Sequence, residues 1–494
     1  MAFEFNQTNL LKFKEEVAGE FQVSGKFETD GRDAIKSVVK TNCFSQINNS
    51  EILATSLAIV GQTNVNMVVL TLDNEIKTIK GAIEWQNKCD ITEAQNASVV
   101  ATTKNVETKI VGESVVVCAM VEISEKGLSE TPIPCLVEGD GVLAKKETKV
   151  VKTASALSQQ RFSIVEDIAL EETTSGVLSV SPNVVVYDVS VADMAATISG
   201  EVFLEVAEEK DDNVVSSFKT IEFKQEVEAV GATQGAEAFA NIYVENLDFV
   251  YSENDEKKQL AVTLNALCEV VCYVSSEAEI TTDAYCLNNI TKTVAACERT
   301  EFIKEAKTEQ KQVAYSEDIS DLADFDEFVC ALASGPVLYN SEALENETNI
   351  CGEAAISLVY KNEEGQLFNK IVNVPFNITA AETNIKTTLV ALKSLAAKVR
   401  AGHEVNIELN LEATYLVNGT EFLEFVSGLE DCGEAEDDDS AIVMAACEEG
   451  EDAFSMGKKL RTRPEDIVSQ NEGLSYSAGE KVFVYKHKEE NFNY

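Results

Sequence analysis

The sequence predicts a mainly β protein in which three tandem antiparallel, sandwich-like repeats precede a small βααβ module. Three observations predict this fold. A strand–turn–strand motif occurs three times, apolar and polar residues alternate around each copy, and the pattern changes after residue 440. With 494 residues, of which 45% are hydrophobic, the chain is long enough for about three domains with apolar cores.

The repeated motif begins with isoleucine, one further residue and glycine, and it ends in an aromatic residue. The glycine precedes the aromatic residue by 24, 23 and 24 positions (61 to 85, 200 to 223, 352 to 376). In the second copy Val202, Leu204 and Val206 alternate with other residues, as in a strand with one buried face. We therefore expect three hairpins, each with its glycine at a bulge or beside another backbone. The copies are Ile59–Trp85, Ile198–Phe223 and Ile350–Phe376.

Further alternating segments flank each motif and extend it into a domain. Segment Glu382–Val399 can also be read as a helix, but its place in the repeat favours strand and turn. We place the β domains at 14–155, 156–305 and 306–428, with the first as the most divergent repeat. Antiparallel sheets in a sandwich-like arrangement suit this pattern.

The net charge argues against several classes of function. The chain has 85 acidic and 40 basic residues, a net charge of −45. A nucleic-acid backbone needs a basic face, and an anionic membrane surface would be repelled. The chain has two histidines, His403 and His487, which leaves few residues from which a Ser–His–Asp triad or a multi-histidine metal site could form. We therefore expect no catalytic residues, no metal and no cofactor.

The cysteines and the first residues point to the cytoplasm. The N-terminal segment lacks the features of a signal peptide. The sequence contains no apolar run of 18 residues, so it predicts no membrane span. The twelve cysteines include no CxxC pair, so they are expected to be reduced thiols rather than zinc ligands. Cys268 and Cys272 are spaced to lie on one face of a strand, as buried hydrophobic residues.

An acidic segment separates the β domains from the last module. Seven of the ten residues from Glu430 to Asp439 are acidic, which predicts a solvated linker at 429–439. A calcium loop is the alternative, but the segment lacks the spaced carboxylates and the final glutamate of an EF-hand. From Asp452 onward there are seven acidic and seven basic residues, so the whole charge of −45 belongs to residues 1–451.

Residues 440–487 predict strand, helix, helix and strand. Asp452 is suited to cap the first helix, and Thr462 with Pro464 to begin the second. The expected elements are a strand at Ile442–Ala446, a helix ending at Leu460, a second helix ending before Asn471–Gly473, and a strand at Val482–Tyr485.

This segment resembles a LysM domain. The matching residues are the Gly450–Glu451 turn, Phe454, Lys458, Pro464–Ile467, Asn471 and Ala478–Lys481. The resemblance implies a shallow groove for N-acetylglucosamine polymers, while Asp452 and Ala453 differ from the usual turn. Capping and packing of a small domain is therefore the competing interpretation of the groove residues. These are Glu451, Asp452, Ala453, Phe454, Asn471, Glu472, Gly473 and Leu474.

A basic cluster lies at the end of the first predicted helix of this module. It either complements the helix dipole or forms a docking patch for an acidic protein partner. Its members are Lys458, Lys459, Arg461 and Arg463.

Together, the β repeats and the last module resemble sporulation proteins that carry SPOCS domains and a C-terminal LysM domain. The resemblance covers nearly the whole chain and is strongest around Ile198–Phe223 and in the LysM-like segment. It implies a non-enzymatic scaffold or adaptor for spore-coat assembly at the forespore surface, in the mother-cell cytoplasm. Its LysM domain would contact a coat morphogenetic ATPase. The alternative is a cell-wall protein whose LysM domain binds peptidoglycan or chitin-type glycans.

Overall fold

The computed structural model describes residues 3–53, 56–90, 98–139, 141–210, 213–254, 257–320, 322, 325–400, 403–435 and 442–485. Antiparallel strands make up most of this part of the chain, and its two helices are short. The predicted mainly β class is therefore confirmed. None of the helices in the described residues is long and apolar enough to cross a membrane.

The first six strands form two three-stranded sheets, ordered β1-β6-β5 and β2-β3-β4. We call residues 5–136 unit 1. Its first strand pairs with its last along their whole length. The bounds are β1 Phe5–Glu28, β2 Ile35–Leu53, β3 Ser56–Thr71, β4 Ile76–Asp90, β5 Ser98–Val111 and β6 Ser114–Leu136.

Unit 2 spans residues 142–286 and has sheets ordered β11-β12-β7 and β10-β9-β8. Cys268 and Cys272 are buried together in its core, which confirms their expected role as buried hydrophobic residues. The bounds are β7 Val142–Ala169, β8 Thr174–Ala192, β9 Ala195–Lys210, β10 Asn213–Glu228, β11 Glu237–Asn254 and β12 Lys257–Cys286.

Unit 3 spans residues 289–434 and has a sheet ordered β13-β19-β18. In its second sheet β16 pairs with β17 on one side and with β14 and β15 on the other. Segment Ile385–Arg400 is strand β18, so the favoured strand prediction is confirmed and the helical alternative is wrong. The other bounds are β13 Asn289–Asp318, β14 Phe325–Ala333, β15 Leu338–Ala343, β16 Thr348–Asn362, β17 Leu367–Ala380 and β19 Glu404–Glu434.

The predicted boundaries differ from these limits. The boundaries at 155/156 and 305/306 fall inside β7 and β13, because the first strand of each unit starts well before the predicted domain. The predicted acidic linker also begins too early. Strand β19 continues to Glu434 and pairs Glu430 with Lys292 of β13. Residues 436–439 of that linker lie outside the described part of the chain.

The three predicted hairpins are β3/β4, β9/β10 and β16/β17, and in each the motif glycine lies directly opposite the motif aromatic. A Cβ atom on Gly200 would lie 2.1 Å from the Val185 carbonyl oxygen and 2.8 Å from the Phe223 ring. The neighbouring strand and the aromatic ring therefore leave room for glycine alone. This confirms the expected close approach of another backbone.

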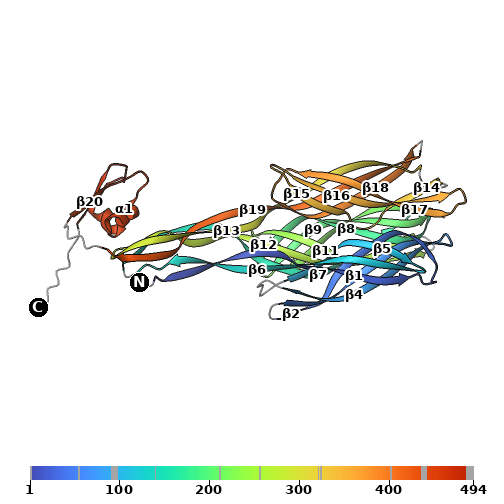
Figure 1. Ribbon diagram of the computed structural model, residues 1–494, viewed down its shortest axis with the longest axis horizontal. Helices are drawn as coiled ribbons and strands as arrows, with labels where there is room; N and C mark the ends of the chain where they lie inside the picture. Colours follow the sequence, from blue (N-terminus) through green and yellow to red (C-terminus); the bar gives the residue numbers. More distant parts are fainter. Residues whose placement is uncertain are drawn as a thin grey trace.

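The long first and last strands of the units extend beyond the sandwiches as two-stranded ribbons. The three ribbons lie side by side and form a stalk, with the N-terminus near its tip (Figure 1). They share an apolar core to which every unit contributes, and this core fixes the ribbons to one another. Its members include Leu10 and Ile133 of unit 1, Val151 and Ile280 of unit 2, and Leu423 and Phe425 of unit 3.

A second shared core joins the sandwiches. Strands β2, β8 and β14 each contain more than one bulge, and the extra residue of one bulge in each strand is Val39, Leu178 and Val329, respectively. All three side chains pack into one cluster between the units. Since a bulge redirects a side chain out of the regular alternation, these bulges turn one residue of each unit toward the other two.

Beyond the stalk, residues 442–485 form a small module that we call the terminal module. Strand β20 (Ile442–Ala446) pairs with β21 (Lys481–Tyr485), and α1 (Ala453–Leu460) and α2 (Pro464–Gln470) lie between them in the chain. Its core contains Met456, Leu460, Ile467, Val482 and Val484. The expected cap of the second helix is wrong. Arg463 is the N-cap residue of α2 instead. Thr462 belongs to the end of α1, because its backbone amide donates a hydrogen bond to the Gly457 carbonyl oxygen (2.9 Å).

Candidate functional site

The start of α1 in the terminal module faces the stalk. Asp452 caps the helix, accepting hydrogen bonds from the Ser455 amide (2.9 Å) and hydroxyl (2.8 Å). Its carboxylate also forms an ion pair of 2.7 Å with Lys145 of β7. Burial alone would raise the pKa of Asp452, but the Lys145 and Ser455 hydrogen bonds lower it to about 2. Asp452 therefore combines its predicted capping role with a contact to unit 2.

Phe454 and Lys458 of α1 also contact the end of β12. The Phe454 ring packs edge-on against Tyr285, with the ring centroids 5.1 Å apart. The Tyr285 hydroxyl donates to the Thr462 carbonyl oxygen (2.5 Å), and burial raises the pKa of this phenol. Lys458 pairs with Asp283 at 2.5 Å. These contacts place the predicted aromatic of the glycan groove against the stalk of the same chain.

The other predicted groove residues lie around the end of α2. The buried Asn471 amide donates to the carbonyl oxygens of Ile467 (2.9 Å) and Phe483 (2.7 Å) and accepts from the Phe483 amide (2.8 Å). These bonds tie α2 to β21, which is the structural role that competed with glycan binding. Ala453 and Leu474 pack on the module core, while Glu472 and Gly473 are exposed.

The predicted basic cluster divides into paired and unpaired groups. Besides Lys458, Lys459 pairs with Glu448 (3.0 Å) and Glu451 (3.1 Å). Arg461 and Arg463 are exposed and form no ion pair with the described residues. The two arginines are therefore the members of the cluster whose charge has no ion-pair partner among the described residues.

Replacing Lys145 with alanine is expected to raise the pKa of Asp452 from about 2 toward its ordinary value of 3.8. Because the folded pKa lies below the ordinary value, the carboxylate stabilises the folded state above pH 3.8, and this contribution is lost as pH falls toward 2. An NMR titration of the Asp452 carboxyl carbon measures the change. Lys149→Ala, on the same strand, is the control and should leave the Asp452 titration unchanged. Equal titration curves for Lys145→Ala and wild type would contradict the assigned contact.

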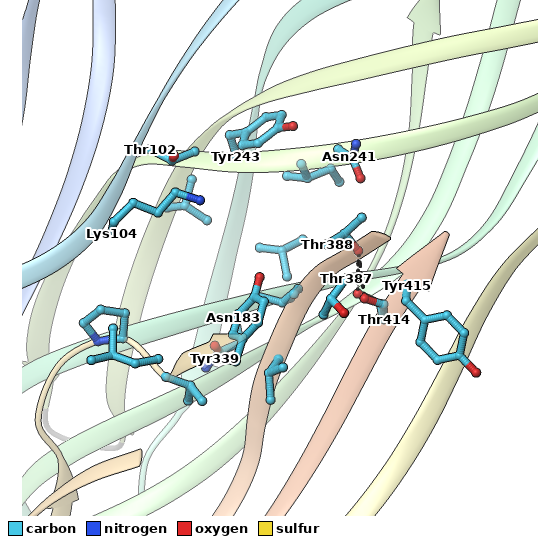
Figure 2. Close-up of a pocket in the computed structure, with 18 of the residues that line it drawn as sticks. Thr102, Lys104, Asn183, Asn241, Tyr243, Tyr339, Thr387, Thr388, Thr414 and Tyr415 are labelled. Atoms are coloured by element: carbon cyan, nitrogen blue, oxygen red, sulfur yellow. Dashed lines mark hydrogen bonds between the residues drawn. The ribbon is translucent and has the colours of Figure 1, made fainter. Parts of the chain in front are cut away.

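A central cavity of about 1650 Å³ lies where the three units meet. Its walls come largely from strands at sheet edges: β2 and β5 of unit 1, β8 and β11 of unit 2, and β15 and β18 of unit 3. Figure 2 shows Asn183, Asn241 and Tyr339 on three of these strands. Their side chains have no hydrogen-bond partner among the described residues, so they are free to hold water or a polar ligand.

Buried ion pairs join the units around this cavity. Lys126 of β6 bonds to Glu269 of β12 and donates to the Tyr243 hydroxyl of β11 (2.6 Å). Burial alone would lower the pKa of Lys126, but Tyr243, Glu269 and Glu15 raise it, so the ammonium stays charged. Lys40 of β2 pairs with Glu205 of β9, whose carboxylate also accepts from the Ala333 amide of unit 3 (2.9 Å). Sequence reasoning missed these pairs, because each partner lies in a different unit.

No group of three or more histidine, cysteine, aspartate or glutamate residues within the described ranges is placed to hold a metal ion. Comparison with known proteins adds no assignment. No family model, no curated protein and no solved structure matches this chain.

Proposed function

We propose that this protein is a non-enzymatic scaffold or adaptor in spore-coat assembly, and that its terminal module docks onto a coat morphogenetic ATPase-like protein. In this proposal units 1 to 3 are SPOCS-like repeats, and the terminal module is a LysM-like domain. The corresponding bulges and the shared glycine–aromatic pairs of the units support the repeats. The free thiols support a location in the reducing mother-cell cytoplasm.

The observation that carries the proposal is an exposed apolar face on the β20–β21 sheet. Ile442 lies opposite Tyr485 and Met444 opposite Phe483 on this face. Their exposed fractions are 53%, 55%, 50% and 43%, respectively. Neighbouring exposed apolar side chains of this kind mark protein interaction sites.

The charge distribution favours a protein partner at this face rather than on the sandwiches. The chain from Asp452 onward is neutral, whereas the preceding residues carry the net charge of −45. The terminal module itself, residues 442–485, has eight acidic and five basic residues, a net charge of −3, so most of the negative charge lies on the rest of the chain. The acidic sandwiches therefore oppose close approach of other acidic proteins far more strongly than this module does. We therefore assign the partner an apolar patch that covers Met444 and Phe483.

Affinity capture from sporulating Firmicute cells tests the proposal. The tagged full chain is expected to retain a coat morphogenetic protein. The double variant Met444→Ser/Phe483→Ser is expected to retain at least about tenfold less of it, because it removes two large apolar side chains from the docking face. Phe422→Ser is the control, because Phe422 is 68% exposed on the stalk. Recovery of no coat protein by the unaltered chain would contradict the proposed function. Equal recovery by the double variant would place the docking surface elsewhere.

A further inference from the structure

A second cavity, of about 540 Å³, lies between units 1 and 2. It falls within the range of roughly 300–1,000 Å³ that is typical of small-molecule sites. Side chains on β2 and β3 form one wall, and side chains on β7, β11 and β12 form the other. The polar side chains at its surface are Gln46, Asn48, Gln62, Asn64, Arg161, Ser163, Glu245, Asn246 and Asn265.

A row of amide side chains on unit 1 lines this cavity together with two amides and one hydroxyl on unit 2. On unit 1, Gln46 lies directly opposite Gln62, and a separate bulge in β2, between Ile47 and Asn49, adds Asn48 to the same wall. On unit 2, Asn265 of the central strand lies between Asn246 on one side and Ser163 on the other. The strand register, rather than a loop, therefore sets the spacing of these side chains.

The unit 1 amides form a continuous chain of hydrogen bonds. Gln46 donates to Asn48 (2.8 Å), Asn48 to Gln62 (3.3 Å), Gln62 to Asn64 (2.9 Å), and Asn64 to the Glu245 carbonyl oxygen (2.9 Å). Each amide uses one N–H group in this chain and keeps a second for another acceptor. The chain thus holds the amide planes in place while donors and acceptors stay open to a ligand.

The cavity is electrically balanced in a very acidic protein. Arg161 forms a bidentate pair with the buried Glu245, through bonds of 2.7 and 2.8 Å, and also donates to the Ile47 carbonyl oxygen (2.5 Å). These two residues are the charged groups among those lining the cavity, and their charges cancel. The site therefore favours neither an anion nor a cation.

We infer that this cavity binds a neutral oligosaccharide. A sugar hydroxyl both donates and accepts a hydrogen bond, and a fixed amide offers a donor and an acceptor in one plane. Such groups on both walls of the cavity match a chain of hydroxyl-bearing rings, and the cancelled Arg161–Glu245 charge matches the lack of charge on the ligand. This site lies between the sandwiches and is distinct from the groove expected in the terminal module.

Calorimetric titration of the full chain with chitotetraose, cellotetraose and maltotetraose tests the inference. At least one of these neutral tetrasaccharides is expected to bind. The double variant Gln46→Ala/Asn265→Ala removes one amide from each wall, leaves the Arg161–Glu245 pair intact, and should weaken binding at least tenfold. Asn410→Ala is the matched control, because Asn410 bonds to Ser394 in unit 3 (2.6 Å) as Asn265 bonds to Ser163 (2.6 Å).

The outcomes separate this cavity from the terminal module. Binding that is lost in the double variant and kept in Asn410→Ala supports the inference, provided that both variants keep the wild-type unfolding temperature. Failure of all three sugars to bind the unaltered chain overturns it. Chitotetraose binding that is unchanged in the double variant also overturns it, and directs attention to the LysM-like groove instead.

Discussion

Replacing Gly61 with alanine is expected to destabilise unit 1 by about 3 kcal/mol, at the upper end of the usual cost of overpacking. A Cβ atom at this position would lie 2.4 Å from the Gln46 carbonyl oxygen and 2.3 Å from the Trp85 ring. Neither neighbour is free to move away. Gln46 belongs to the adjacent strand of the sheet, and the Trp85 indole N–H donates to the buried Thr63 hydroxyl (3.1 Å).

Urea unfolding followed by tryptophan fluorescence measures this effect, because Trp85 is the one tryptophan of the chain and lies beside the substituted residue. Gly139→Ala is the matched control, since a Cβ atom there meets nothing within 4 Å. The Gly61 variant should unfold at a clearly lower urea concentration and the Gly139 variant close to wild type. Equal midpoints for the two variants would show that the glycine is not required by the hairpin.

Replacing Glu205 with glutamine is expected to cost roughly 3–5 kcal/mol of unfolding free energy, because it leaves the Lys40 ammonium buried without a counter-charge. Lys40 and Glu205 are 1% and 2% exposed. The Glu205 carboxylate also accepts from the Ser216 hydroxyl (3.2 Å) and the Ala333 amide (2.9 Å). Groups from all three units therefore meet at one carboxylate.

A double-mutant cycle with Lys40→Met separates the ion pair from other effects of the substitution. The double variant is expected to be more stable than the sum of the single effects predicts, since it removes both charges. Glu301→Gln is the control. It breaks the exposed Arg299–Glu301 pair and should cost about 1 kcal/mol or less. Additive single effects, or a cost of Glu205→Gln no larger than that of Glu301→Gln, would rule out a buried ion pair between the units.

The hairpins could be predicted because their signal is local. Gly200 and Phe223 are separated by one turn, so a fixed spacing along the chain becomes a direct pair across the strands. The same reasoning correctly favoured a strand at Ile385–Arg400 over a helix, which the spacing of its apolar residues also allows. In both cases the residues that decide the structure lie within one motif and its immediate neighbours.

The stalk and the cavities could not be predicted in this way. Residues such as Ala278 and Ile280 alternate with polar neighbours like those of any strand, and what buries them is a ribbon from another unit. The same holds for the contact of Phe454 with Tyr285, which joins segments far apart in the sequence. The predicted groove residues lie at the start of α1 and around the end of α2, but a single sequence carries no signal that the stalk contacts Asp452 and Phe454.

The stalk has a mechanical consequence. Strand β19 runs from the sandwich of unit 3 to the stalk tip and is hydrogen-bonded to β13 along this path (Figure 1). Tension between the terminal module and the sandwiches acts parallel to these strands, so it must shear many hydrogen bonds at once. A pull that separates β1 from β6, or β19 from β13, at the tip acts across the strands instead, and can open that ribbon one hydrogen bond after another. We therefore expect the stalk to resist tension along its axis more strongly than tension across it.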